Sequence, residues 1–269
     1  MTTGYVLALC MSPQDGAQTT SETTESSENI IRHRDISCTE RWHWDTQDVE
    51  AEGAALLCDD TKTAVTFHPH WSNGTAGIRA TRPLAGEFNY WEIHVGDRVF
   101  GTSLMFGLTT KKARLMSKEF KNLIGEDIHG WGLSHKGHLY HNGISSYYCK
   151  PFKEYTPVVV GILVDRKRGE ITYFKDGVNL GVAFKNVNQV QEDMYPTISS
   201  TAAKTYMSLG LRVRTFVDLQ DRCRHIIAQS LGELAPASQG MISEDIADKV
   251  ASLPLPARVK DFIRCGMHS

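Results

Sequence analysis

Residues 157–174 read PVVVGILVDRKRGEITYF, and apolar residues occupy both odd and even positions from Pro157 to Val164. A strand that is apolar on both faces is typical of the centre of a sheet. The residues from Asp165 to Gly169 supply a turn, after which Glu170-Ile171-Thr172-Tyr173-Phe174 begins a second β-favouring run. The stretch therefore predicts a central strand that turns into its neighbour within a β-rich domain.

Similar short runs occur on both sides of this pair. Tyr90-Trp91-Glu92-Ile93-His94-Val95 and Leu104-Met105-Phe106-Gly107-Leu108 both have the composition of strands. Asn142-Gly143 and Asp176-Gly177 stand beside β-favouring runs, where a primed hairpin turn needs positive φ. Many short strands with turns about every ten residues predict a mainly β chain, folded as an antiparallel β-sandwich.

The composition disfavours several functional classes. A net charge of -2 offers no field to attract nucleic acid or an anionic membrane surface. The apolar run from Tyr5 to Met11 lacks a basic flank and is far shorter than the ~20 residues that span a bilayer. The cysteines show no close pair that would suggest a zinc site or a disulfide framework, and they are Cys10, Cys38, Cys58, Cys149, Cys223 and Cys265. A reducing compartment, the cytoplasm or the nucleus, fits best.

The chain divides into three predicted parts. Residues 1–37 are expected to form a disordered tail, because Ser, Thr, Glu and Gln dominate from Ser12 to Asn29. Residues 38–214 form the sandwich. Residues 215–269 change to a helical period, and three short helices are predicted there, with Thr215 or Asp218 capping the first, Ser243-Glu244-Asp245 opening the second and Pro256 opening the third.

Three short helices form a weak core by themselves, so this segment should pack on the sandwich, on partners, or on both. Leu219, Cys223 and Ile227 are spaced by four and therefore share one helical face. Such a stripe is usually intramolecular core, but Leu253-Pro254-Leu255-Pro256 downstream favours docking of a partner. Cys223 is interpreted as a small apolar residue at this contact, and not as a nucleophile.

No catalytic signature or cofactor site is visible. The sequence lacks a phosphate-binding loop, a nucleophile elbow and a His-Glu-x-x-His motif. Its histidine pairs lack the cysteine or carboxylate that would complete a zinc site. Trp42, Trp44, Trp91 and Trp131 are core candidates, whereas Trp71 lies on a predicted loop and is either part of a recognition surface or a lid on the sandwich.

An ordered set of motifs resembles those of SPRY domains. The set comprises Tyr90-Trp91-Glu92-Ile93, Trp131-Gly132-Leu133-Ser134, Tyr173-Phe174-Lys175-Asp176-Gly177, Leu180-Gly181-Val182-Ala183-Phe184 and Tyr195-Pro196-Thr197-Ile198-Ser199. The C-terminal segment resembles a SOCS box. Together they resemble the SPRY domain-containing SOCS box family, in which the SPRY domain captures a short, often Asn-containing, peptide of a target protein and the SOCS box recruits a ubiquitin ligase.

The resemblance implies a peptide pocket on loops at one end of the sandwich. The implied pocket residues are His70, Trp71, Asn73, Thr102, Phe120, Thr201, Ala202 and Ala203. His70 and Asn73 stand where the best-known members have Pro and Gln, and Phe120 stands where they have Tyr. Ala202 replaces a Trp, so a large apolar wall and a hydrogen-bond donor are missing and the same peptide should not be assumed to bind.

The resemblance also implies the partners of the C-terminal segment. Leu219, Cys223 and Ile227 correspond to the Elongin C contact, with Elongin B bound beside it. Cullin-5, which carries a RING subunit, would contact Leu253, Pro254, Leu255, Pro256 and Phe262. The expected function is therefore that of a non-catalytic adaptor of a ubiquitin ligase, which promotes ubiquitination and proteasomal degradation of its targets. A peptide-binding scaffold with no link to a ligase is the alternative.

Overall fold

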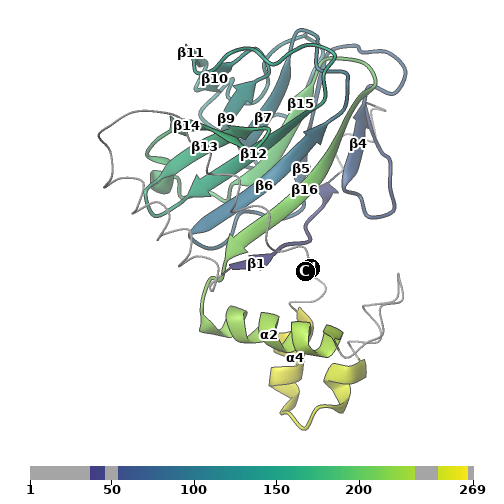
Figure 1. The fold of residues 1–269 in the computed structure, drawn as a ribbon, viewed down its shortest axis with the longest axis vertical. Coiled ribbons are helices and arrows are strands. Elements are labelled where there is room, and N and C mark those ends of the chain that lie inside the picture. The colour runs from purple at the N-terminus through teal and green to yellow at the C-terminus, as the bar shows by residue number, and fades with distance from the viewer. Residues whose placement is uncertain (1–36, 46–53, 234–247, 266–269) are drawn as a thin grey trace, which may run out of the picture.

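Two antiparallel β-sheets pack face to face, and a small helical unit lies beyond one end of them (Figure 1). The computed structural model describes residues 37–45, 54–233 and 248–265. Sheet A has the order β14-β13-β12-β6-β16-β4-β3, with β1 beside β16. Its strands are β1 (Ser37–Thr39), β3 (Ala55–Leu57), β4 (Ala64–Phe67), β6 (Phe88–Val95), β12 (Val158–Asp165), β13 (Glu170–Lys175), β14 (Val178–Phe184) and β16 (Thr205–Thr215).

Sheet B has the order β11-β10-β9-β7-β15-β5-β2, with β8 beside β5. Its strands are β2 (Trp44–Asp45), β5 (Thr75–Ala80), β7 (Leu104–Thr109), β8 (Met116–Ser117), β9 (Gly130–Ser134), β10 (His138–His141), β11 (Ile144–Tyr147) and β15 (Tyr195–Ser200). A 3-10 turn, η2 (Val187–Gln189), precedes β15. The predicted antiparallel β-sandwich is confirmed.

The predicted central strand is β12, which pairs with β6 on one side and β13 on the other. Val160, Ile162 and Val164 point into the core and are fully buried. Val159 and Leu163, on the opposite face, are half-buried. The outer face of sheet A is thus partly exposed at this strand, although the sequence is apolar on both faces.

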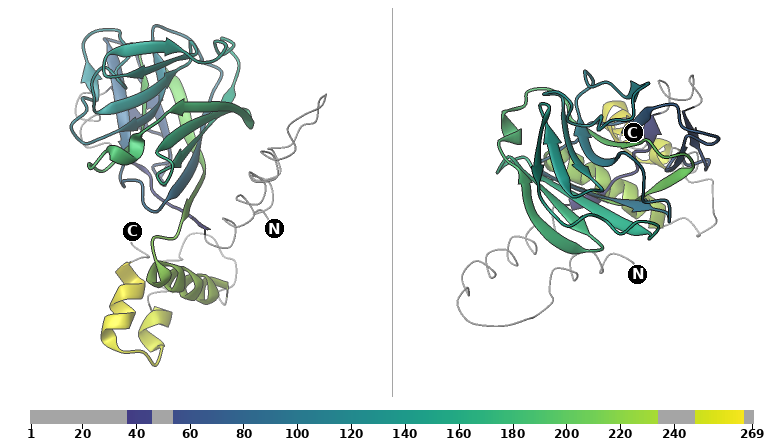
Figure 2. Two further views of the ribbon diagram at one scale, coloured as in Figure 1. Left: turned by 90° about the vertical axis from the view of Figure 1, so that its left-hand side faces the viewer. Right: turned by 90° about the horizontal axis from the view of Figure 1, so that it is seen from above.

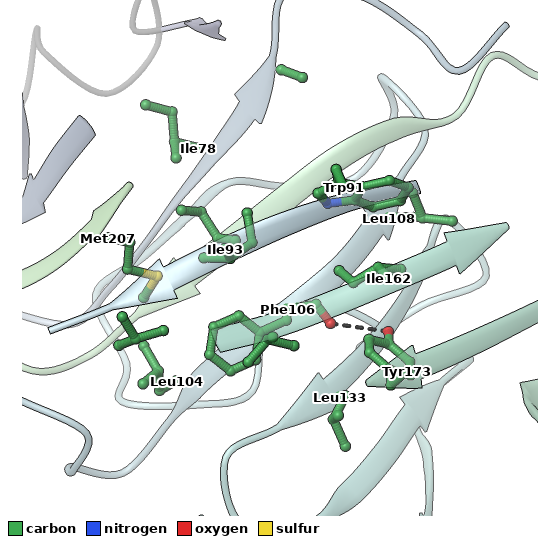
Figure 3. Close-up of a cluster of buried hydrophobic side chains, with 14 of the residues drawn as sticks. Ile78, Trp91, Ile93, Leu104, Phe106, Leu108, Leu133, Ile162, Tyr173 and Met207 are labelled. Atoms are coloured by element: carbon green, nitrogen blue, oxygen red, sulfur yellow. Dashed lines mark hydrogen bonds between the residues drawn. The ribbon is translucent and has the colours of Figure 1, made fainter. Parts of the chain in front are cut away.

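The core between the sheets is built from aromatic and branched side chains (Figure 3). Trp91 and Ile93 of β6 face Phe106 and Leu108 of β7, and all four are buried. The hydroxyl of Tyr173 donates a hydrogen bond to the carbonyl oxygen of Phe106 at 3.0 Å. This bond satisfies the polar tip of a fully buried ring, which would otherwise cost about 1–3 kcal/mol.

Both predicted hairpin turns are confirmed by their backbone angles. Asn142 and Gly143 have φ values of 53° and 70°, and Asp176 and Gly177 have values of 50° and 80°. These left-handed values belong to primed turns, whose twist matches that of the strands that they join. The turns connect β10 to β11 and β13 to β14.

The helical unit contains α2 (Leu219–Glu233) and α4 (Ala257–Cys265), with a helical stretch over residues 248–252 between them. Figure 2 shows the unit beyond the end of the sandwich at which β16 finishes. Among the described residues, neither helix has the length and apolar composition needed to cross a membrane.

The structure selects one of the two predicted caps of the first helix. Helix α2 begins at Leu219, since Asp218 caps it by accepting a hydrogen bond from the Asp221 amide at 2.7 Å. Thr215 is not the cap, because it ends β16 and its hydroxyl accepts hydrogen bonds from the amides of Glu87 and Phe88. The tail predicted over 1–37 lies outside the described residues except for Ser37, which already belongs to β1, and so does the predicted opening of the second helix at 243–245.

Candidate functional site

Three loops, together with strand β8 and the loop that follows it, meet at the end of the sandwich away from α2 and α4 (Figure 1) and are here called the cleft loops. They are residues 68–74, 98–103, 116–121 and 201–204, and strand pairing brings them together. The amide of Lys204 donates to the carbonyl oxygen of His68 at 3.0 Å, and the amide of Thr201 donates to that of Ser103 at 2.9 Å. The four loops therefore form one connected rim.

A close approach at Gly74 joins two of these loops. Gly74 has φ +143°, and a Cβ atom built on it would lie 2.1 Å from the carbonyl oxygen of Ser117. The hydroxyl of the next residue, Thr75, donates to the carbonyl oxygen of Glu119 at 2.7 Å and accepts from the amide of Lys121 at 3.0 Å. Glycine at position 74 thus allows loop 68–74 to lie directly against loop 116–121.

A cleft of about 700 Å³ opens between these two loops, within the size range of ligand sites. Its lining residues are Ala54, His68, His70, Trp71, Asn73, Gly74, Thr75, Met116, Ser117 and Lys118. The lining therefore combines one large aromatic ring, hydrogen-bonding groups and a cation. Such a mixture suits a short peptide that carries both apolar and polar groups.

Three of the predicted pocket residues line this cleft. His70, Trp71 and Asn73 lie on loop 68–74 and are all exposed. Trp71 has 75% of its surface exposed, while the other four tryptophans are buried as predicted. An indole ring left this open is not a lid packed on the sandwich, so the recognition-surface interpretation of Trp71 is favoured.

The loop that holds the next three predicted residues is largely buried. The Thr201 hydroxyl accepts a hydrogen bond from the Ser103 amide at 2.9 Å and donates one to the Ser103 carbonyl oxygen at 3.0 Å. Ala202 is 5% exposed, and its Cβ lies 3.1 Å from where a Cβ on Gly101 would stand. Thr201 and Ala202 therefore hold the loop in place and present little surface, whereas Ala203 is half-exposed.

The remaining two predicted pocket residues lie outside the cleft lining. Thr102 is exposed on loop 98–103, next to the anchored Ser103. Phe120 is 51% exposed on loop 116–121, between the two residues that Thr75 holds. Conversely, no local sequence signal marks Met116, Ser117 or Lys118, since this segment reaches the cleft through the pairing of Met116 and Ser117 with β5 across about forty residues of chain.

His68 fixes the base of the cleft. Its Nε2 atom lies 3.0 Å from the carbonyl oxygen of Ser200 and donates a hydrogen bond to it. The side chain is buried, and this burial lowers the pKa of His68 below 6.5, although the bond to Ser200 acts in the opposite direction. Neutral His68 therefore links loop 68–74 to β15.

The unfolded chain binds a proton at His68 near pH 6.5, whereas the folded chain resists protonation there. The stability that depends on this difference is present above pH 6.5 and decreases as the pH falls towards the lower folded pKa. In thermal unfolding between about pH 7.5 and about pH 5.5, wild type should lose more stability than His68→Gln. His70→Gln, an exposed change on the same loop, serves as the control and should follow wild type. Equal slopes for wild type and His68→Gln would contradict this account.

The helical unit leaves apolar side chains exposed on α2. Leu219 is 74% exposed and Cys223 is exposed, whereas Ile227 is half-buried. Ile227 packs with Leu253 and Leu255 around the fully buried Val250. Two of the three predicted Elongin C contacts are therefore open.

The predicted Cullin-5 segment is divided in the same way. Leu253 and Leu255 are half-buried within the helical unit, whereas Pro254 and Pro256 are exposed. The side chain of Phe262 lies outside the described part. The prolines and not the leucines thus present most of the surface of this segment.

Arg214 connects the sandwich to the helical unit. At the end of β16, its guanidinium forms ion pairs with Asp221 of α2 and with Glu40, the latter at 2.7 Å. Burial acts to lower the pKa of Arg214, but the hydrogen bond and charge of Asp221, with Glu40 beside it, raise it. Since β16 begins beside the cleft and ends here, a single strand of roughly 33 Å joins the two candidate sites.

No group of three or more histidine, cysteine or acidic side chains in the described ranges is arranged to hold a metal ion.

Comparison with known proteins identifies a domain and a group of relatives. The SPRY domain model matches residues 88–212. SPRY domain-containing SOCS box protein 3 of Xenopus laevis is 31% identical over 224 residues, which cover 82% of this chain and 57% of that protein. The Xenopus tropicalis protein is 32% identical with the same coverage. The chain thus spans a little over half the length of these relatives.

A related protein and a solved structure agree with this finding. SPRY domain-containing SOCS box protein 1 of Bos taurus is 26% identical over 215 residues, covering 73% of this chain and 72% of that protein. The crystal structure of the TRIM65 PSpry domain superposes with a TM-score of 0.50 at 13% identity, covering 72% of this chain and 99% of that chain. This structural likeness supports the sandwich fold. The ordered motifs and the sequence identities above support the relationship to SPRY domain-containing SOCS box proteins. The chain thus contains a SPRY domain and is related over 82% of its length to SPRY domain-containing SOCS box proteins.

Proposed function

We propose that the chain is the substrate-recognition subunit of an Elongin B, Elongin C and Cullin-5 ubiquitin ligase. In this role the cleft binds a short peptide of a target protein, and the helical unit recruits the ligase, which includes a RING subunit. The chain performs no bond chemistry itself and acts by proximity, raising the effective concentration of target lysines near the transferred ubiquitin. Its targets are then degraded by the proteasome. We place this action in the cytoplasm or the nucleus.

The observation that carries the proposal is the exposure of Leu219 and Cys223 on a helix anchored to the sandwich. An apolar stripe that the chain covers itself would be core and would need no partner. Of Leu219, Cys223 and Ile227, only Ile227 packs on Val250 within the described part of the chain. The family names of the relatives, which include the SOCS box, support the same role.

The cleft supports the peptide-binding half of the proposal. Trp71 supplies a large exposed apolar surface, and aromatic anchors of this kind dominate many interfaces. Asn73 and Ser117 add groups that can bond to a peptide backbone. Because Ala202 lacks the ring that stands there in the best-known members, the apolar contact shifts towards Trp71, and we expect a different peptide preference.

The alternative is a peptide-binding scaffold whose helices merely support the sandwich. Truncation after Val217 separates the two, since it keeps Thr215, which holds the amides of Glu87 and Phe88. We expect the truncated chain to stay folded and to bind the same peptides as the full chain, because the described helices join the sandwich chiefly through Arg214 and its neighbours. Circular dichroism and thermal unfolding of the truncated chain measure this. Aggregation of the truncated chain would favour the scaffold. Thr215→Stop is the control, and it should be less stable because it lacks the hydroxyl that holds the amides of Glu87 and Phe88.

Affinity capture with the proteasome blocked tests the cleft and finds the targets. Wild type should retain proteins that Asn73→Arg and Thr102→Arg both lose, since a long cation on the rim obstructs a docked peptide. Lys204→Arg, an exposed change that conserves charge, is the control and should retain them. Identical captures by wild type and both rim variants would reject these loops as the binding site.

A further inference from the structure

Strand β11 is an open edge of sheet B. It pairs with β10 and with no other strand of the described chain, and all four of its residues are exposed. Ile144 and Tyr147 are 70% and 66% exposed. Its sequence, Ile-Ser-Ser-Tyr, has none of the charges or prolines by which edge strands commonly avoid pairing with another chain.

The edge of sheet A that lies on the same side is protected. Strand β14 carries register shifts against β13, and Gly181 within it has φ +94°. The hydroxyl of Tyr148 donates to the carbonyl oxygen of Gly181, which occupies an acceptor on this edge. Irregular backbone and an occupied acceptor both hinder the addition of a strand. The contrast points to β11 as the edge that can accept one.

The hairpin fixes which backbone groups of β11 face outward. In a two-residue hairpin the closing pair, here His141 and Ile144, is hydrogen-bonded, so Ser146 also points towards β10. The amide of Tyr148 continues this alternation by donating to Gly137 at 2.9 Å. Ser145 and Tyr147 therefore direct their N–H and C=O groups away from the sheet, and within the described part of the chain no hydrogen bond uses them.

We propose that β11 pairs with β11 of a second copy of this chain, antiparallel and across a two-fold axis. The outward groups match when Ser146 of one copy faces Ser146 of the other. Ser145 of each copy then stands opposite Tyr147 of the other copy. Each of the two residues in each copy donates one N–H, giving about four hydrogen bonds between the chains. Tyr147 then covers Ser145 of the other copy on both sides of the axis, as an isologous interface requires.

Charge is compatible with this pairing. Strand β11 is uncharged, so two copies do not repel one another along it. The outward groups of β11 thus match those of a second copy, and no like charges oppose this match, which favours a second copy as the partner.

The contact is small, below the ~1,200 Å² of standard interfaces, so the dimer is weak and concentration-dependent. Strand β11 lies at the end of the sandwich away from α2 and α4 (Figure 1), which leaves both helical units free. A dimer carries two clefts, and a target with two binding segments would gain avidity.

Two measurements on the full chain test the pairing. In sedimentation velocity, wild type should shift from monomer to dimer at concentrations of tens to hundreds of micromolar. Ser145→Pro, which removes an outward N–H, and Ser145→Lys, which adds a charge, should each weaken the dimer at least about tenfold. Gln191→Lys, an exposed change elsewhere, should match wild type. Thermal unfolding checks that each variant is folded.

Cross-linking tests the register. Non-hydrogen-bonded partners lie about 4.5 Å apart between Cα atoms, within the range of a disulfide. Ser146→Cys should therefore form a covalent dimer under mild copper phenanthroline oxidation at least about tenfold faster than Ser145→Cys or wild type. A wild type that remains monomeric at these concentrations, or equal cross-linking of Ser146→Cys and Ser145→Cys, would overturn the proposal.

Discussion

Leu219→Asp should abolish co-purification of the chain with Elongin B and Elongin C. Leu219 is the first residue of α2 and is largely exposed. The change removes an apolar anchor and introduces a charge that would lose its water when a partner binds. Truncation of a central anchor commonly costs about 2 kcal/mol or more, which is at least a ~30-fold loss of affinity, and a buried charge adds to it. Titration of purified Elongin B–Elongin C against the chain, by calorimetry, measures the loss.

The matched control for this change is Gln220→Asp. Gln220 is the next residue on the helix and is also exposed, but it lies off the face shared with Cys223 and Ile227. It should bind Elongin C as wild type does. Both variants should keep the unfolding temperature of the sandwich, since neither side chain is in its core. Equal affinity of wild type and Leu219→Asp would remove α2 as the docking element.

Trp71→Ala should remove most of the affinity of the cleft for its peptide. The indole is the largest apolar side chain in the lining, and a Trp anchor is among the residues whose loss most often costs about 2 kcal/mol or more. We therefore expect at least a ~30-fold loss of affinity for a monovalent peptide taken from a captured target, measured by fluorescence polarisation. Folding should be unaffected because the ring is exposed.

The control for Trp71→Ala is another exposed aromatic residue. Tyr147→Ala removes a ring of similar exposure from the opposite edge of sheet B, far along the strand order from β5 and the cleft. Its affinity for a monovalent peptide should equal that of wild type. Should Trp71→Ala bind as tightly as Tyr147→Ala, the cleft would not be the recognition site.

The sandwich was largely predictable because its signals are local. Side-chain parity marks β12 as central, and the chemistry of Asn142-Gly143 and Asp176-Gly177 specifies two turns. The buried tryptophans follow from the same alternation. By contrast, the pairing of β8 with β5 depends on contacts between distant residues, which no local pattern encodes.

The candidate site was predictable only in part for the same reason. Loop 68–74 could be identified by its resemblance, and the exposure of Trp71 agrees with it. Lys118 could not, because its place in the cleft depends on the close approach at Gly74. Ala202 departs from the family pattern, in which a Trp stands at this position, and the structure buries it against Gly101, since a small side chain lets the two loops close together.

For the helical unit, the sequence pattern predicts an apolar helix face but not whether that face is core or interface. A stripe such as Leu219, Cys223 and Ile227 has the same sequence pattern whether it is core or interface. The structure divides it, since Ile227 packs on Val250 while Leu219 remains open. Periodicity alone could not make this distinction, because it specifies a face and not what covers that face.

The most direct test of the account is a bridging assay with immobilised Elongin B–Elongin C and a captured target. The target should be retained on the beads when the wild-type chain is present. Trp71→Ala should bind the beads without the target, and with Leu219→Asp neither the chain nor the target should be retained. The assay is run at concentrations where the chain is monomeric, so that both sites must lie on one molecule. Retention of the target without the chain, or equally with Trp71→Ala, would contradict the claim that this chain joins cleft to ligase.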